Sequence, residues 1–141
     1  AIPFVAARKV EQAIAVWPQR PGRAYAELRS ATSLMPFDYQ IYLLGGSIAL
    51  NLEDPPAARY WLGEAERHDN QGWLAPFALG LLEGERNRPA IARARLTRAR
   101  ALNPREPVIA LALDRLAHKR FLGFTEAQRL LASRNEQRFG R

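Results

Sequence analysis

The stretch LGLLEGERNRPAIARARLTRARALNP, residues 79–104, decides the fold class. In its second half, Ala92, Leu96 and Ala99 recur at i, i+4 and i+7, the spacing that places apolar side chains on one stripe of an α-helix. Alanine on such a stripe lets two helix backbones approach closely, and leucine fills the space between them. Proline suits the first turn of a helix, so Pro89 indicates where this helix begins. The stretch therefore predicts two helices, joined by a short loop, that pack as an antiparallel hairpin.

The same pattern recurs along the chain with a period of 34 residues. Three sets of apolar residues keep this spacing: Ala24, Ala58 and Ala92; Leu28, Leu62 and Leu96; and Ala31, Ala65 and Ala99. Gly46 and Gly80 are also one period apart. A helical pattern with this period is typical of stacked helical hairpins, in which each hairpin buries apolar surface against the next.

These patterns predict an all-α chain of tandem antiparallel helical hairpins, with about eight helices in one repeat domain over residues 1–141. The predicted hairpins lie near residues 4–36, 38–70, 72–104 and 106–139. A chain of 141 residues is long enough to bury roughly 68–70% of its unfolded surface, so it needs no disulfide or metal to fold. The sequence has no cysteine, which excludes thiolate–metal sites and thiol redox chemistry.

The repeat resembles the tetratricopeptide repeat (TPR) family in the spacing of its small and apolar residues. In the third hairpin the resemblance is carried by Leu79-Gly80, Ala92-x3-Leu96-x2-Ala99 and Pro104. The second hairpin shares Tyr42, Gly46, Ala58, Leu62 and Ala65, with Asn70 at the place of the proline. The fourth departs most, because Asp114 takes the glycine place and Glu126 and Ser133 take the alanine places. The resemblance implies an α-solenoid that serves as a scaffold for protein–protein interaction.

A narrower resemblance points to the protein from which this chain comes. The segments RALNPREPVI (residues 100–109) and FTEAQ (124–128), followed by a basic end, are similar to the soluble tail of bacterial membrane proteins of the O-antigen ligase and polymerase family. The chain starts with Ala-Ile-Pro rather than methionine, and we interpret it as a piece of a larger protein. The resemblance implies a soluble domain attached to a membrane-bound, glycan-transferring enzyme. Because that family's catalytic work lies in its membrane part, no catalytic residue is carried over to this chain.

No set of residues in the sequence forms a recognisable catalytic or cofactor site. There is no glycine-rich phosphate loop after a strand and no nucleophile elbow. The only histidines are His68 and His118, and His68 lies at a predicted helix end, where it suits the helix dipole better than a metal ion. We therefore predict a non-catalytic chain with no metal and no cofactor.

The first helix of each hairpin in such a stack lines its concave side. The residues expected to face outward from these helices are Lys9, Ala13, Gln40, Leu43, Ser47, Leu74, Phe77, Leu81, Leu111, Arg115, His118 and Lys119. The predicted groove is apolar in its middle and basic at one end, which suits a protein or peptide partner with an apolar segment and an acidic end. For Phe77 and Leu81, packing against the adjacent hairpin is the alternative. The groove lacks the Lys and Asn pattern that clamps a peptide C-terminal carboxylate, so that ligand class is excluded.

Positive charge is concentrated in the C-terminal part of the sequence. Residues 1–85 hold 7 basic and 10 acidic side chains, a net of −3, whereas residues 86–141 hold 14 basic and 4 acidic ones, a net of +10. The densest basic patch is Arg93, Arg95, Arg98 and Arg100. This asymmetry indicates an anionic partner, such as a phospholipid surface, nucleic acid or an acidic protein. A solvated helix face, or the arginine bias of a GC-rich genome, is the alternative. No aromatic residue interleaves with these arginines, which argues against single-stranded nucleic acid.

Overall fold

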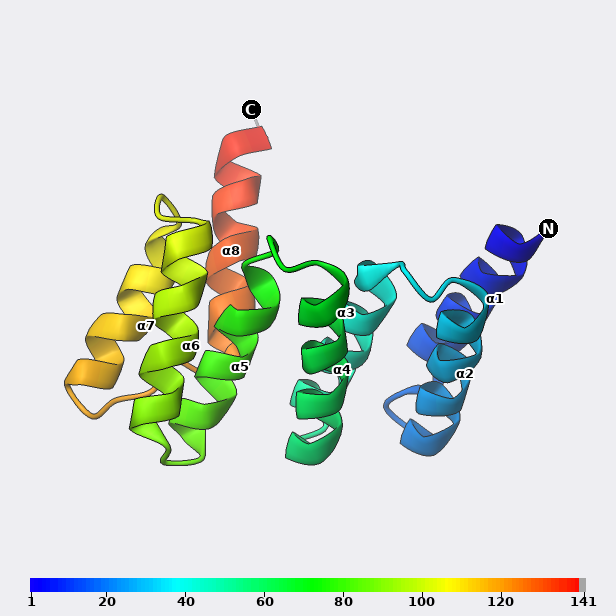
Figure 1. Ribbon diagram of the computed structural model, residues 1–141, viewed down its shortest axis with the longest axis horizontal. Coiled ribbons are helices and arrows are strands. Elements are labelled where there is room, and N and C mark those ends of the chain that lie inside the picture. Colours follow the sequence, from blue (N-terminus) through cyan, green and yellow to red (C-terminus); the bar gives the residue numbers. More distant parts are fainter. Residues whose placement is uncertain (140–141) are drawn as a thin grey trace. The chain divides into compact units, whose positions relative to one another are not determined.

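The computed structural model describes residues 1–139 and shows an all-α chain of antiparallel hairpins, as the sequence predicts (Figure 1). Within these residues there are eight α-helices and no β-strand. The helices are α1 (Ile2–Val16), α2 (Pro21–Leu34), α3 (Tyr39–Asn51), α4 (Pro55–His68), α5 (Leu74–Glu85), α6 (Pro89–Leu102), α7 (Pro107–Ala117) and α8 (Phe124–Phe139). The chain divides into two compact units, Ala1–Asn70 with α1 to α4 and Gln71–Arg141 with α5 to α8. We call them the N-terminal unit and the C-terminal unit.

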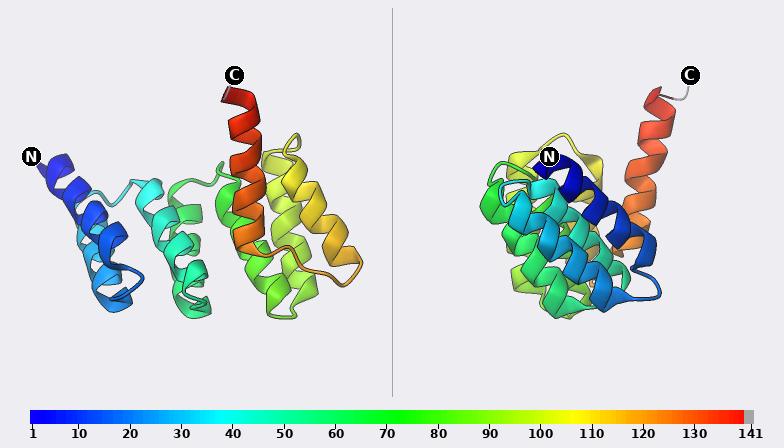
Figure 2. Two further views of the ribbon diagram at one scale, coloured as in Figure 1. Left: turned by 180° about the vertical axis from the view of Figure 1, so that it is seen from behind. Right: turned by 90° about the vertical axis from the view of Figure 1, so that its right-hand side faces the viewer.

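Each unit contains two successive helical hairpins. In the N-terminal unit, α1 packs on α2, α3 packs on α4, and α2 contacts α3. In the C-terminal unit, α5 packs on α6, α7 contacts both of these helices, and α8 contacts α5 and α7. Figure 2 shows the chain reversing direction between α1 and α2 and again between α3 and α4. The boundary between the units follows Asn70, where the second predicted hairpin ends.

Residues that are 34 positions apart in the sequence occupy equivalent buried places in the structure. The nine alanine and leucine residues that keep the period are all at most 2% exposed to solvent; they are Ala24, Leu28, Ala31, Ala58, Leu62, Ala65, Ala92, Leu96 and Ala99. They lie on the second helix of each of the first three hairpins, on the stripe that faces the core. The spacing read from the sequence therefore identifies the buried face of α2, α4 and α6.

Two glycines of the repeat are required by the close approach of paired helices. A Cβ atom added at Gly46 would lie 2.4 Å from Cδ2 of Leu62, and one added at Gly80 would lie 2.7 Å from Cδ2 of Leu96. Atoms of real side chains do not approach so closely, so a side chain at either position would push the two helices of the hairpin apart. The glycine of the first helix and the leucine of the second thus form one matched contact, repeated in both units.

The repeat extends to the loops between paired helices. Glu53 and Asn87, one period apart, both adopt a left-handed backbone, with φ of 54° and 60°. In both loops the amide of the following residue donates to the carbonyl five residues earlier, Asp54 to Ala49 and Arg88 to Glu83, each at 2.9 Å. These bonds satisfy carbonyl groups that the end of a helix leaves without an intrahelical partner. The same turn therefore closes the α3–α4 and α5–α6 hairpins.

In the last hairpin the register shifts by one residue from the predicted one. The sequence repeat places Glu126 where the earlier hairpins have a buried alanine, but the buried residue is Ala127, which is 1% exposed. Glu126 instead accepts a hydrogen bond of 2.9 Å from Nη1 of Arg115 and so ties α8 to α7. A second ion pair joins Arg134 of α8 to Glu106, which caps the start of α7. The shift follows from the connection between α7 and α8, since α8 begins at Phe124, one residue later than the 34-residue period counted from the start of α6 at Pro89.

A tyrosine links the two hairpins of the N-terminal unit. The hydroxyl of Tyr25 on α2 donates to Oδ2 of Asp54 at 3.1 Å, while Oδ1 of Asp54 accepts the amide of Ala57 at 3.3 Å and so caps α4. Burial, and after it the carboxylate of Asp54, raises the pKa of Tyr25 well above its usual range. Its hydroxyl therefore stays protonated in the folded chain.

We expect the stability of the wild-type chain to decrease above pH 10.0, the usual pKa of tyrosine, more steeply than that of Tyr25→Phe. A group whose pKa is raised by folding contributes fully below its unfolded pKa and loses that contribution as the pH rises towards its folded pKa. Urea midpoints measured between about pH 8 and pH 11 test this. Tyr60→Phe, which alters an exposed ring, is the matched control. The same pH dependence in wild type and Tyr25→Phe would contradict the assignment.

Candidate functional site

An open groove lies between α1 and α3 in the N-terminal unit, with a volume of about 410 Å³. One side comes from α1 and consists of Pro3, Ala6, Ala7, Val10 and Glu11. The other side comes from the α2–α3 loop and α3 and consists of Met35, Asp38, Gln40, Ile41 and Leu44. We call this feature the α1–α3 groove. Of the residues that the sequence places on a binding surface, Gln40 is the one that lines it.

The α1–α3 groove is apolar with two carboxylates in its lining. Ala6 and Ile41 are almost fully buried, whereas Glu11 is exposed and Asp38 is half-buried. Oδ1 of Asp38 accepts the amide of Gln40 at 3.1 Å, which caps the start of α3. Among residues 1–134, whose side chains the structure describes, neither Glu11 nor Asp38 belongs to an ion pair. No basic side chain lines the groove, so its charge is negative.

The remaining predicted groove residues of the N-terminal unit lie elsewhere. Leu43 and Ser47 are half-buried on α3 and do not line the α1–α3 groove. Ala13 is fully buried, and Nζ of Lys9 lies 3.3 Å from Oε2 of Glu27, so Lys9 ties α1 to α2. Sequence reasoning missed the lining residues of α1. Their signal was present, because Pro3, Ala6, Ala7 and Val10 are spaced at i, i+3, i+4 and i+7.

In the C-terminal unit, two residues that were predicted to form the apolar middle of the binding surface belong to the hydrophobic core. Phe77 is 1% exposed and Leu81 is 4% exposed, and both belong to the cluster that contains Leu96 and Ile109. This corrects their placement on an open groove and agrees with the packing alternative. The physical reason is that α7 packs over the same part of α5. Leu74, at the start of α5, keeps 42% of its surface exposed.

The predicted basic end of the groove is only partly available for binding. Arg115 is paired with Glu126, and their hydrogen bond raises the pKa of the arginine and lowers that of the glutamate. His118 follows the last turn of α7, where its Nδ1 lies 2.9 Å from the carbonyl oxygen of Asp114. His118 and Lys119 are exposed. At this end of α7, Arg115 is therefore held by Glu126 of α8, and His118 lies beside Asp114 of its own helix.

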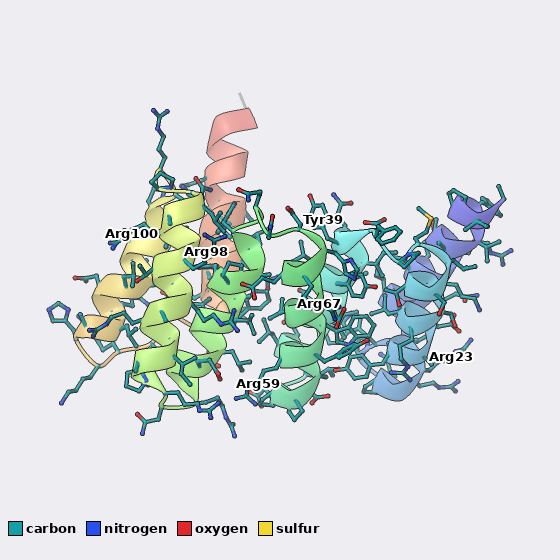
Figure 3. All side chains as sticks on the ribbon, in the orientation of Figure 1. Arg23, Tyr39, Arg59, Arg67, Arg98 and Arg100 are labelled. Atoms are coloured by element: carbon teal, nitrogen blue, oxygen red, sulfur yellow. The ribbon has the colours of Figure 1, made fainter. Side chains whose placement is uncertain are left out.

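The four arginines of α6 divide into two pairs. Arg93 and Arg100 are seven residues apart and share one side of the helix, whereas Arg95 and Arg98 are three apart and share another. The two sides flank the buried stripe of Ala92, Leu96 and Ala99. Figure 3 shows Arg98 and Arg100 leaving α6 on different sides. Arg95 and Arg98 also contact other groups of the protein. The four arginines therefore form two separate basic pairs, one on each side of the buried stripe of α6.

His68 occupies an aromatic cluster at the end of α4. Its ring stacks on Tyr42 with a centroid separation of 4.8 Å, and its Nε2 lies 3.6 Å from Oε2 of Glu64.

In the described part of the chain, no three His, Cys, Asp or Glu residues come together as a candidate metal site. Within residues 1–139, no helix combines the length and the apolarity needed to cross a membrane.

The fold and the groove define a class of protein, an all-α chain of antiparallel helical hairpins with a 34-residue packing register. No protein-family model matches the sequence, and no curated protein matches it.

Proposed function

We propose that the chain is a non-catalytic module for protein–protein interaction, of the TPR type. The observation that carries this proposal is the α1–α3 groove, an open apolar surface on a scaffold of tightly packed hairpins. Open concave sites with an apolar lining and a few polar groups are the usual form of binding sites. Of the carboxylates in the N-terminal unit, Asp38 in the groove lining caps α3 and Asp54 caps α4, so both have structural roles.

The parent that we propose is a bacterial membrane protein of the O-antigen ligase and polymerase family, for which this chain would form a soluble tail. The support is the resemblance over residues 100–109 and 124–128. The first of these segments spans the turn between α6 and α7, and the second begins α8. We expect the reading frame that encodes the chain to continue upstream into several membrane spans. An upstream sequence without membrane spans would contradict this assignment and leave the binding proposal intact.

Affinity capture from membranes of the native host tests the interaction role. We expect the folded chain to retain a specific protein that a Gly46→Val/Gly80→Val variant does not retain, because the variant loses the close packing of both hairpins. Crosslinking before solubilisation, followed by mass spectrometry, identifies the retained protein. Recovery of the same proteins by both chains would contradict a role that depends on the folded surface.

A second candidate function is binding of anionic surfaces, such as phospholipid membranes, by the C-terminal unit. The observation in its favour is the net charge of +10 over residues 86–141, with Arg93, Arg98 and Arg100 exposed on α6. Co-sedimentation with phosphatidylglycerol vesicles at about 50 and 200 mM salt tests it, because electrostatic binding weakens steeply as salt increases. Duplex DNA at the same salt concentrations separates a lipid surface from nucleic acid. Failure to bind vesicles at low salt would exclude this function.

A further inference from the structure

We infer that the α1–α3 groove binds a peptide segment that presents a large apolar side chain next to a lysine or arginine. The inference rests on the proposed interaction role and specifies the chemistry of the partner. It also reverses the charge expected from the sequence, which predicted a partner with an acidic end.

The apolar part of the inference follows from the shape and lining of the groove. On α1 the short side chains of Ala6 and Ala7 leave space, and on the opposite side Ile41 and Leu44 supply apolar surface. A volume of about 410 Å³ lies within the roughly 300–1,000 Å³ of sites that bury most of a bound group. Burial of apolar side chains there is favourable because it removes apolar surface from water. The groove therefore favours a ligand with a bulky apolar group over a wholly polar one.

The basic part follows from the two carboxylates. Glu11 and Asp38 both line the groove, and neither has an ion-pair partner among residues 1–134. An apolar ligand that covers the two carboxylates without supplying a cation removes their hydration and replaces it with no favourable interaction. A lysine or arginine beside the apolar group compensates for this loss. An acidic segment would instead be repelled, so the lining discriminates by charge as well as by shape.

The surface beside the groove extends the contact area for such a segment. Phe4, which follows Pro3 on α1, is 65% exposed. Exposed apolar side chains that adjoin an apolar groove mark interaction surfaces more often than isolated ones do. A bound segment that extends from the groove along the start of α1 would cover the ring of Phe4 as well.

A random peptide library displayed on phage and selected on the full wild-type chain tests the inference. We expect the enriched peptides to share a Leu, Ile, Phe or Met within two positions of a Lys or Arg. One enriched peptide, labelled with a fluorophore, then gives dissociation constants for four variants. Ala7→Trp fills the groove and is expected to weaken binding at least about tenfold. Ala15→Trp places the same side chain at an exposed position of α1 outside the groove and is expected to have no effect.

Two neutral variants test the charge separately from the shape. Glu11→Gln removes one carboxylate, and Asp38→Asn removes the other while keeping a good residue at the N-cap of α3. We expect each to weaken binding by about three- to tenfold, with a smaller effect at high salt. Circular dichroism confirms that every variant stays folded.

Each outcome decides a different point. Peptides that Ala7→Trp blocks but that lack a basic residue and ignore the neutral variants would overturn the charge selection. Enrichment of acidic peptides would overturn it as well. Failure to enrich any peptide that Ala7→Trp blocks would overturn the groove as the docking site. None of these results decides whether the chain is an interaction module, because the affinity capture tests that role independently of the groove.

Discussion

Leu62→Ala and Leu96→Ala are each expected to lower the free energy of unfolding by about 2–5 kcal/mol. Both leucines are only 2% exposed and occupy the same place in the repeat, one in each unit. Truncation removes apolar contacts and leaves a cavity that the neighbouring helices fill only in part. Urea denaturation followed by circular dichroism measures the change, and the two variants are expected to lose similar amounts.

Leu74→Ala is the matched control for these truncations. This leucine has the same side chain but is 42% exposed at the start of α5. We expect its truncation to cost less than about 1 kcal/mol, because a large share of the lost surface already faces water. If Leu62→Ala were no more costly than Leu74→Ala, the repeat leucines would not be the centre of the packing.

Gly46→Ala and Gly63→Ala are expected to change stability in opposite directions. At Gly46 the new Cβ would meet Leu62 at 2.4 Å, so we expect a loss of about 1–3 kcal/mol from overpacking. At Gly63, inside α4, nothing lies within 4 Å of the new Cβ. Alanine there removes the entropic cost of a helical glycine, so we expect a gain of about 0.5–1 kcal/mol.

The sign of the difference is the informative result, because helix propensity favours alanine at both positions. Thermal and urea melts of the two variants, compared with wild type, measure it. A gain at both positions would show that α3 and α4 tolerate a wider separation than the contact between Gly46 and Leu62 implies. A loss at both would show that Gly63 has a contact that its open surroundings do not indicate.

The sequence predicted the hairpins well because their packing is local and periodic. All nine alanine and leucine residues of the repeat are buried, so the same spacing predicts both the helix and its buried face. The prolines at the start of α2, α4 and α6 mark the same register. Even the closing turns follow it, since Glu53 and Asn87 adopt the same left-handed backbone.

The prediction failed where tertiary contacts override the period. In the last hairpin, the strict spacing selects Glu126 as the buried residue, but α8 begins one residue late, at Phe124, so that place moves to Ala127. Phe77 and Leu81 were ambiguous for a related reason. Whether an apolar residue on α5 faces a groove or a neighbour depends on the position of α7, which spacing within α5 does not contain.

The candidate site was predicted least well, because it depends on a junction between helices distant in sequence. Only Gln40 of the predicted surface residues lines the α1–α3 groove. The stripe on α1 was visible, but small residues such as Ala6 and Ala7 are equally typical of helix packing. The negative charge of the groove depends on Glu11 and Asp38 coming together, and the overall charge of +7 gives no indication of that.

The 34-residue repeat is a structural unit in which a glycine of one helix is matched to a leucine of the next, Gly46 to Leu62 and Gly80 to Leu96. A double-mutant cycle on Gly46→Ala and Leu62→Ala tests it most directly. We predict that Gly46→Ala costs about 1–3 kcal/mol in the wild-type background and becomes neutral or stabilising in the Leu62→Ala background, because the atoms that the new Cβ would meet are gone. Additive effects, within about 0.5 kcal/mol, would contradict the contact and with it the register on which the fold assignment depends.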